Sequence, residues 1–312
     1  MFAAKVKSYA KVNLSLHIAG AEGGYHLIDS VAANIDVHDT IAAKSRRDRL
    51  VNVYMHGLGS ENIPPERNNA VKAGEAFVSA FGTRGADIEI YKDIPMGAGL
   101  GGSSADAAGV LNALAKMYKV KDRAALKALA DSLGSDTGYM LEGGFARLTG
   151  RGTEISPLVC TKTLYMLLFL PETEVSSAEC YREYDRAPDS AGDSGALVRA
   201  LAAGDFSGIC KNVYNALGAP AARLNPEVDE ALRAAAFFSP SAYTVTGSGS
   251  AVFALFESEE LCRWAKSRYR GGLKTRVVKT VAPKAHSSGI SRAFSPFALT
   301  EEEIERANDK ND

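Results

Sequence analysis

The stretch Pro95-Met96-Gly97-Ala98-Gly99-Leu100-Gly101-Gly102-Ser103-Ser104-Ala105 holds four glycines and two serine hydroxyls within eleven residues. It lies between a strand-like run and a long helical pattern. Glycine lets backbone amides point inward without a Cβ in the way, and it tolerates positive φ. A ring of such amides that ends on a helix N-terminus makes a phosphate site. The serine hydroxyls suit phosphate oxygens or a bound Mg²⁺. The stretch therefore predicts a phosphate-binding loop rather than a plain flexible turn.

Three known types of glycine-rich loop are candidates for this stretch, and the flanking residues distinguish them. The Walker pattern requires a Lys and then Ser or Thr directly after its last Gly, whereas Ser103 follows Gly102 here and the next lysine is Lys116. A dinucleotide-binding loop requires a second strand with an acidic residue about twenty positions on. Asp122 lies near that distance, but a helical pattern precedes it. The His-Arg-Asp and Asp-Phe-Gly motifs of protein kinases are absent from the sequence. A dinucleotide oxidoreductase is therefore disfavoured, and the other two designs are excluded.

Size and charge limit the class of protein. The chain of 312 residues is long enough for two domains, and its 46% hydrophobic and 23% charged residues are typical of a soluble globular protein. A formal net charge of −1 offers no electrostatic argument for binding nucleic acid or an anionic membrane. The longest apolar run, 164–170, is too short to cross a bilayer. The four cysteines are widely spaced, which is typical of reduced thiols rather than a disulfide frame or zinc site. We therefore expect a cytoplasmic protein with neither a nucleic-acid nor a membrane partner.

The N-terminal segment has the alternating pattern of a half-buried strand. Lys11 and Asn13 share its polar face, which predicts that both side chains point away from the core. Gly23-Gly24 break the strand just before the pair Tyr25-His26. A second alternating run over 31–37 is expected to pair with the first as an antiparallel neighbour.

Further elements follow from helical and strand periodicity along the chain. Asp122 is a plausible N-cap of a helix that Gly134 ends. The polar tail over 285–312 predicts a short helix or a disordered end. The remaining predicted elements are helices at about 70–81, 104–118 and much of 191–236, and strands around 88–90, 164–170, 251–256 and 277–278.

The phosphate loop resembles the Pro-x-x-x-Gly-Leu-x-Ser-Ser-Ala motif of the GHMP kinases, with one additional residue between the leucine and the serines. The matching residues are Pro95, Gly99, Leu100, Ser103, Ser104 and Ala105. The stretch 133–136 occupies the place of the family's Gly-Ala-Asp, and 247–250 looks like its third, glycine-rich motif. Taken alone, Asp136 is more often a turn former than a catalyst, and 247–250 is equally consistent with a tight hairpin turn.

The resemblance implies a two-domain α+β fold and a division of the chain. The N-terminal GHMP kinase domain, similar to ribosomal protein S5 domain 2, would span 1–158. The C-terminal domain, a ferredoxin-like α/β sandwich, would span 159–284, and the polar tail would follow over 285–312. We expect a monomer or a homodimer, and the sequence does not decide between them.

ATP-dependent phosphorylation of a small-molecule hydroxyl is the activity that the resemblance implies. The loop from Pro95 to Ala105 would bind the ATP phosphates, with Ser103 or Ser104 near Mg²⁺. Asp136 would orient the attacking hydroxyl or accept its proton, and Lys11 would keep Asp136 ionised and offset charge on the alkoxide.

The pair Tyr25-His26 resembles the element that binds cytosine in one branch of the family. That branch phosphorylates the 2-hydroxyl of a cytidine-diphosphate-linked methylerythritol in the non-mevalonate route to isoprenoids. Tyr25 would stack on the base, His26 would hydrogen-bond its edge, and Asn13 would face the methylerythritol end. The alternatives are a GHMP kinase for homoserine, mevalonate or a sugar, and a catalytically silent member that only binds a nucleotide.

Overall fold

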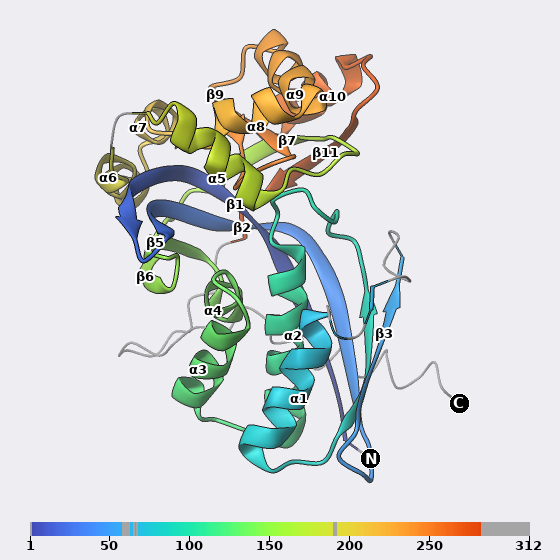
Figure 1. Cartoon of the computed structure of the whole chain (residues 1–312). Coiled ribbons are helices and arrows are strands. Elements are labelled where there is room, and N and C mark those ends of the chain that lie inside the picture. The colour runs from blue at the N-terminus through green and yellow to red at the C-terminus, as the bar shows by residue number, and fades with distance from the viewer. Residues whose placement is uncertain (1, 58–62, 65, 67, 190–191, 282–312) are drawn as a thin grey trace.

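The computed structural model describes residues 2–57, 63–64, 66, 68–189 and 192–281. Residues 58–62, 65, 67 and 190–191 and the whole predicted tail at 285–312 lie outside these ranges. Within them, two β-sheets with separate helical layers form the two domains of the molecule (Figure 1).

The first sheet has seven strands, in the order β3-β4-β2-β1-β8, with β5 paired to β2 and β6 paired to β5. Its strands are β1 (Ala3–Glu22), β2 (Tyr25–Ser45), β3 (Val51–His56), β4 (Ala86–Tyr91), β5 (Phe145–Gly150), β6 (Glu154–Leu158) and β8 (Tyr214–Asn215). Strands β1 and β2 pair antiparallel along nearly their whole length, which confirms the predicted hairpin. Gly23 and Gly24 form its turn with φ values of 57° and 79°, which glycine adopts without strain.

Four helices cover one face of this sheet (Figure 1). They are α1 (Asn69–Phe81), α2 (Gly102–Tyr118), α3 (Arg123–Leu133) and α4 (Thr137–Glu142). Helix α2 is rich in alanine and buried on most of its circumference, because it packs against β1, β2, α1 and α4. The Asp122 side chain accepts a hydrogen bond from the Ala125 amide, which confirms the predicted N-cap of α3. The short helix α4 was not expected from the sequence.

The second sheet is a four-stranded antiparallel layer in the order β11-β7-β10-β9. Its strands are β7 (Tyr165–Leu170), β9 (Ala242–Val245), β10 (Val252–Phe256) and β11 (Lys274–Lys279). Numbered within the domain, this order is 4-1-3-2, the arrangement of the predicted ferredoxin-like sandwich. The helices of this half are α5 (Ser177–Arg186), α6 (Gly195–Ala203), α7 (Phe206–Lys211), α8 (Gly218–Leu224), α9 (Pro226–Phe237) and α10 (Glu259–Arg268). The α+β, two-domain fold expected from the sequence is thus confirmed.

The two halves of the chain are joined by more than the linker between them. The short strand β8 pairs in parallel with β1, and Thr280 forms an isolated bridge with Ile35. One hydrophobic cluster contains buried side chains from both sheets. The junction between the domains is therefore packed, and the phosphate loop lies within it. No helix in the described ranges is long and apolar enough to cross a membrane.

Candidate active site

The phosphate loop is held from both domains. Its Leu100 carbonyl accepts a hydrogen bond from the Lys11 amide of β1 at 3.0 Å, and its Ala98 carbonyl accepts one from the Ala251 amide at 3.1 Å. Gly99 has a φ of 73°, and a Cβ at this position would lie only 2.3 Å from the Thr246 carbonyl oxygen. Glycine is required here because the turn of the second domain rests directly on the loop.

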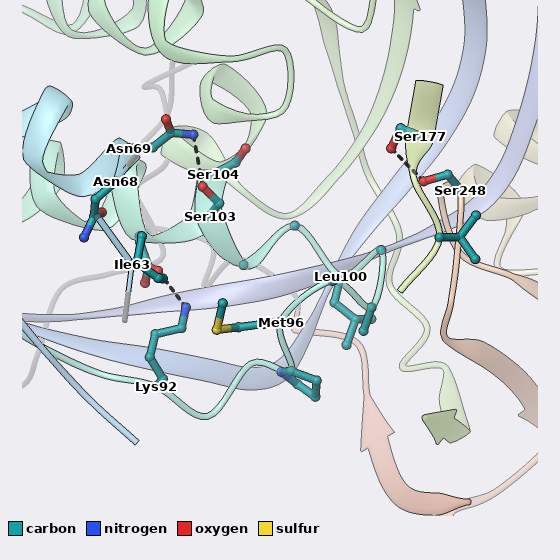
Figure 2. Close-up of a pocket in the computed structure, with 18 of the residues that line it drawn as sticks. Ile63, Asn68, Asn69, Lys92, Met96, Leu100, Ser103, Ser104, Ser177 and Ser248 are labelled. Atoms are coloured by element: carbon teal, nitrogen blue, oxygen red, sulfur yellow. Dashed lines mark hydrogen bonds and ion pairs between the residues drawn. The ribbon is translucent and has the colours of Figure 1, made fainter. Parts of the chain in front are cut away.

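A cavity of about 540 Å³ opens on one side of this loop (Figure 2). The loop forms one wall, the start of α1 forms another, and Ser177 and Ser248 of the second domain close the far end. Ser103 and Ser104 lie in the first turn of α2, where the free amides and the helix dipole favour a phosphate. The Asn69 side-chain amide donates to the Ser103 hydroxyl at 3.0 Å. The cavity therefore combines the features that the sequence predicts for a nucleotide phosphate site.

A second cavity of about 310 Å³ meets the first at the same loop. The two cavities share Gly99, Gly101, Ser177 and Ser248 in their linings. The second cavity is also lined by the predicted catalytic and substrate residues Lys11, Asn13, His26 and Asp136. A molecule in this cavity would thus lie next to the terminal phosphate of a nucleotide in the first.

Lys11 and Asp136 face each other across the second cavity. The Lys11 Nζ lies 3.8 Å from Asp136 Oδ2, which is an ion-pair distance but longer than a hydrogen bond. Asp136 precedes α4, so the unexpected helix places this carboxylate at the cavity wall. Next to it, burial and then the charge of Asp136 raise the pKa of Tyr181 to about 12, so this phenol stays neutral at physiological pH.

Lys11 and Asn13 line the second cavity rather than the core, as predicted, but this face of β1 is not exposed to solvent. Their exposed fractions are only 6% and 4%. The second domain covers this face of β1: the Asn13 amide donates to the Thr246 hydroxyl at 3.0 Å. A Cβ on Gly247 would lie 3.3 Å from the Lys11 Nζ. The polar face of the strand is buried because it lines a site between domains, which periodicity within one strand does not reveal.

Of the pair Tyr25-His26, only His26 lines the second cavity. Its ring stacks on Tyr181 with centroids 4.6 Å apart, and its Nε2 lies 2.7 Å from Asp185 Oδ1. Tyr25 lies at the hairpin tip with 58% of its surface exposed and is not among the residues that line the cavity.

Arg151 is a cavity residue that the sequence reasoning missed. It lines the second cavity, and its guanidinium carbon lies 3.9 Å from the centre of the Tyr25 ring. This is a cation–π contact between two elements that are far apart in the sequence. The only signal in the sequence is a single cation between two glycines, at Gly150-Arg151-Gly152.

A buried ionic cluster at the base of the phosphate loop was also missed. Lys92 Nζ donates to Asp39 and, at 2.6 Å, to Asp106 Oδ2. Asp39 also accepts hydrogen bonds from the Asp93 and Ile94 amides, which follow the end of β4 at Tyr91. The cluster joins the residues just before the loop to α2 just after it.

Burial sets the protonation of this cluster. Burial raises the pKa of Asp106 to about 8, although the Lys92 ammonium opposes the rise. Burial alone would lower the pKa of Lys92, but the two carboxylates outweigh it and raise that pKa. The acidic residue in an apolar helix and the lysine before the loop were visible in the sequence, but their contact depends on the fold.

Two family profiles match this chain, one in each half of the sequence. The profile described as the GHMP kinases N terminal domain matches residues 68–146, and the GHMP kinases C terminal profile matches 197–263. A 4-diphosphocytidyl-2-C-methyl-D-erythritol kinase from Pelotomaculum thermopropionicum is 36% identical over 267 residues, which are 84% of this chain and 92% of that protein.

Solved structures agree with these matches. A crystal structure of 4-(cytidine 5'-diphospho)-2C-methyl-D-erythritol kinase superposes with a TM-score of 0.74 and 31% identity, covering 88% of this chain and 98% of that one. A homoserine kinase from Cytophaga hutchinsonii has a TM-score of 0.70 at 19% identity, covering 90% and 95% of the two chains. At that identity the second likeness concerns the fold alone.

Proposed function

This chain belongs to the GHMP kinase family, and we propose that it transfers the terminal phosphoryl group of ATP to the 2-hydroxyl of 4-diphosphocytidyl-2-C-methyl-D-erythritol. Family membership makes it an ATP-dependent phosphotransferase with an alcohol as acceptor. The observation that carries the proposal is the meeting of two cavities at Gly99 and Gly101, with the carboxylate of Asp136 in the second one.

The first cavity is the proposed ATP site. Phosphoryl transfer requires the protein mainly to position the reactants and to stabilise charge. The loop from Pro95 to Ala105 supplies backbone amides at the start of α2, and these amides would bind the phosphates. The terminal phosphate would then point past Gly101 toward the second cavity.

The second cavity is the proposed acceptor site. As the new bond between the acceptor oxygen and phosphorus forms, the bond from phosphorus to the leaving oxygen of ADP breaks, and the acceptor hydroxyl loses its proton. Asp136 would orient that hydroxyl or accept the proton. Lys11, 3.8 Å from Asp136, would offset the negative charge that develops on the acceptor oxygen.

The cytidine end of the acceptor fits the outer part of this cavity. His26 and the Tyr181 ring offer a polar edge and an aromatic face near the cavity wall. Arg151 supplies a cation that suits a diphosphate. Tyr25 would reach the base only after exchanging its contact with Arg151 for one with the substrate.

Mg²⁺ is a further part of the proposal. In the described ranges no group of three or more His, Cys, Asp or Glu side chains is arranged to hold a metal. Mg²⁺ that travels with nucleotide phosphates needs few protein ligands, so the hydroxyls of Ser103 or Ser104 fit it. When bound, the ion neutralises charge on the phosphates.

The proposal also includes a cytoplasmic location. Cys160, Cys180, Cys210 and Cys262 are all free thiols. This supports a reducing compartment, because disulfides are rare there.

A panel of acceptors tests the proposed reaction. Purified protein with Mg-ATP is given the cytidine-linked methylerythritol, homoserine, mevalonate or galactose, and ADP release is followed. We expect turnover with the first acceptor. Turnover with another acceptor alone would place the chain elsewhere in the family, and ATP binding without turnover would indicate a silent member.

The variant Asp136→Asn tests the assigned chemistry. We expect kcat to fall by about 10²–10⁴-fold, the usual size of a lost proton-transfer group, while ATP still binds. Asp122→Asn is the matched control, because asparagine preserves the N-cap of α3 outside both cavities. Equal turnover of Asp136→Asn and the native protein would refute the role of this carboxylate.

A further inference from the structure

A chain of three buried hydrogen bonds begins at Lys11. Its Nζ donates to Asn13 Oδ1 at 2.6 Å, and Asn13 Nδ2 donates to Ser30 Oγ at 2.8 Å. The Ser30 hydroxyl in turn donates to the Ser15 carbonyl oxygen at 2.6 Å. Ser30 has no exposed surface, so water does not replace either of its two partners in this chain.

The end of this chain determines its direction. A backbone carbonyl only accepts, so the single hydroxyl proton of Ser30 is committed to Ser15. The Ser30 oxygen can then only accept a hydrogen bond from Asn13, and the atom of Asn13 that faces it must be the amide nitrogen. The carbonyl oxygen of the Asn13 side chain therefore has to face Lys11.

We propose that Ser30 is a positioning residue for the reaction, acting through Asn13 to hold the Lys11 ammonium beside Asp136. The inference rests on the proposed function for the role of Lys11. Ser30 is outside the linings of both cavities and was not singled out by any motif. Without its hydroxyl the Asn13 amide can rotate, and its NH₂ group would then face the ammonium and repel it.

The second domain makes this control of orientation necessary. The Asn13 backbone amide is bound to the Thr246 hydroxyl, and Gly247 packs so closely that a Cβ there would lie 3.3 Å from the Lys11 Nζ. Lys11 thus has little room to move. Its ammonium position depends on whether the oxygen or the nitrogen of the Asn13 side chain faces it.

Other charged and titratable groups also face this part of the cavity. They are Asp136 from the start of α4, His26 from β2, Arg151 from the turn after β5 and Tyr181 from α5. Tyr139 of α4 is buried outside the cavity, where burial and then the charge of Asp136 raise its pKa. The substitutions used below leave all of them in place, so a change in pH dependence can be assigned to Lys11 and its orientation.

The test compares Ser30→Ala with Ser30→Thr, which retains a hydroxyl at a strand position that suits threonine. Ser194→Ala is the control, because it removes another hydroxyl that is 1% exposed and that bonds Ser15 Oγ and the Asp29 carbonyl, outside the chain to Lys11. For each protein we would measure kcat, the KM for ATP, the pH profile of kcat and the melting temperature.

We expect Ser30→Ala to lower kcat about tenfold, equivalent to about 1.4 kcal/mol. The KM for ATP should stay within about twofold. The pH profile of kcat should differ from that of the native protein, because the ammonium no longer lies beside Asp136 and the acceptor hydroxyl. Ser30→Thr should restore most of the rate. A Ser30→Ala protein with a lower melting temperature but the native kcat and pH profile would show a merely structural role and overturn the proposal.

A second readout needs no acceptor and separates this inference from the proposed function. The rate at which acetic anhydride modifies Lys11, followed by mass spectrometry, should rise several-fold in Ser30→Ala, because the amine loses its hydrogen bond to Asn13. It should not rise in Ser194→Ala. If native protein lacks turnover but Lys11 is released as expected, the proposed function fails and the positioning stands. Unchanged labelling overturns the positioning. Ser30→Cys, of similar volume but with weak hydrogen-bonding ability, replaces Ser30→Ala if the latter does not fold.

Discussion

Lys11 and Lys92 both lie beside the phosphate loop and both face aspartates, but their surroundings differ. Lys11 is 3.8 Å from Asp136, whose side chain is 35% exposed. Lys92 donates hydrogen bonds to both Asp39 and Asp106, and none of these three side chains is more than 5% exposed. One cation faces a cavity, and the other is sealed beneath the loop.

The difference indicates that the Lys92 cluster stabilises the loop, whereas the Lys11–Asp136 pair is available to a substrate. A buried ionic group that loses its partner is costly, so the Lys92 cluster resists rearrangement and fixes both ends of the loop. The longer Lys11–Asp136 contact leaves the Asp136 carboxylate with acceptor capacity for a substrate hydroxyl. Short, sealed ion pairs here support the architecture, whereas the looser pair next to solvent is the one available for chemistry.

The largest expected effect comes from removing each lysine in turn. Lys92→Met should lower the free energy of unfolding by about 3–5 kcal/mol, because it leaves the buried Asp39 carboxylate without its cation. Lys11→Met should lower that free energy by less, about 1–3 kcal/mol, because the buried Asn13 side-chain oxygen loses its donor, but it should lower kcat about 10²–10³-fold. Denaturant unfolding and steady-state kinetics measure the two quantities.

Lys5→Met on the exposed part of β1 is the control for both variants, because it removes a lysine from the same strand without reaching either site. The comparison would fail if Lys92→Met kept its stability and lost only its turnover, or if Lys11→Met unfolded the protein.

A smaller effect is expected in the pH dependence of stability. The Asp106 carboxyl keeps its proton up to about pH 8 in the folded chain, whereas its ordinary pKa is 3.8. Unfolding between these values releases that proton, so the contribution of Asp106 to stability falls as pH rises, by up to about 1.4 kcal/mol per pH unit.

Asp106→Asn removes the titrating group and should gain stability relative to the native protein from pH 5 to pH 8, with no further gain above about pH 8. Thermal unfolding across this range measures the difference. A constant difference between the two proteins at every pH would mean that Asp106 is already ionised when folded.

The smallest expected effect concerns the outer part of the open site. Tyr25→Ala should raise the KM for the cytidine-linked acceptor about two- to tenfold, the value of one aromatic stack, and leave the KM for ATP unchanged. Phe2→Ala, which removes an exposed aromatic ring at the other end of the sheet, is the control. An unchanged KM would mean that Tyr25 remains with Arg151 and takes no part in binding the acceptor.

Local patterns in the sequence predicted much of the fold. The period-2 runs identified the β1–β2 hairpin, and the glycine-rich loop before a helical run identified the start of α2. Asp122 was recognised as an N-cap because capping depends on residues three positions apart. The place of Asp136 came from a family resemblance, since nothing local distinguishes it from an ordinary turn residue.

Neighbouring residues and motif spacing were therefore enough to predict most of the longer helices and strands, the phosphate loop and the family of kinases to which the chain belongs. Tertiary structure alone decided that Lys11 is buried, that Arg151 and not Tyr25 lines the cavity, and that Lys92 joins Asp39 to Asp106. Each of these depends on contacts between segments distant in the chain, and the burial of a polar side chain is set by what the other domain places over it.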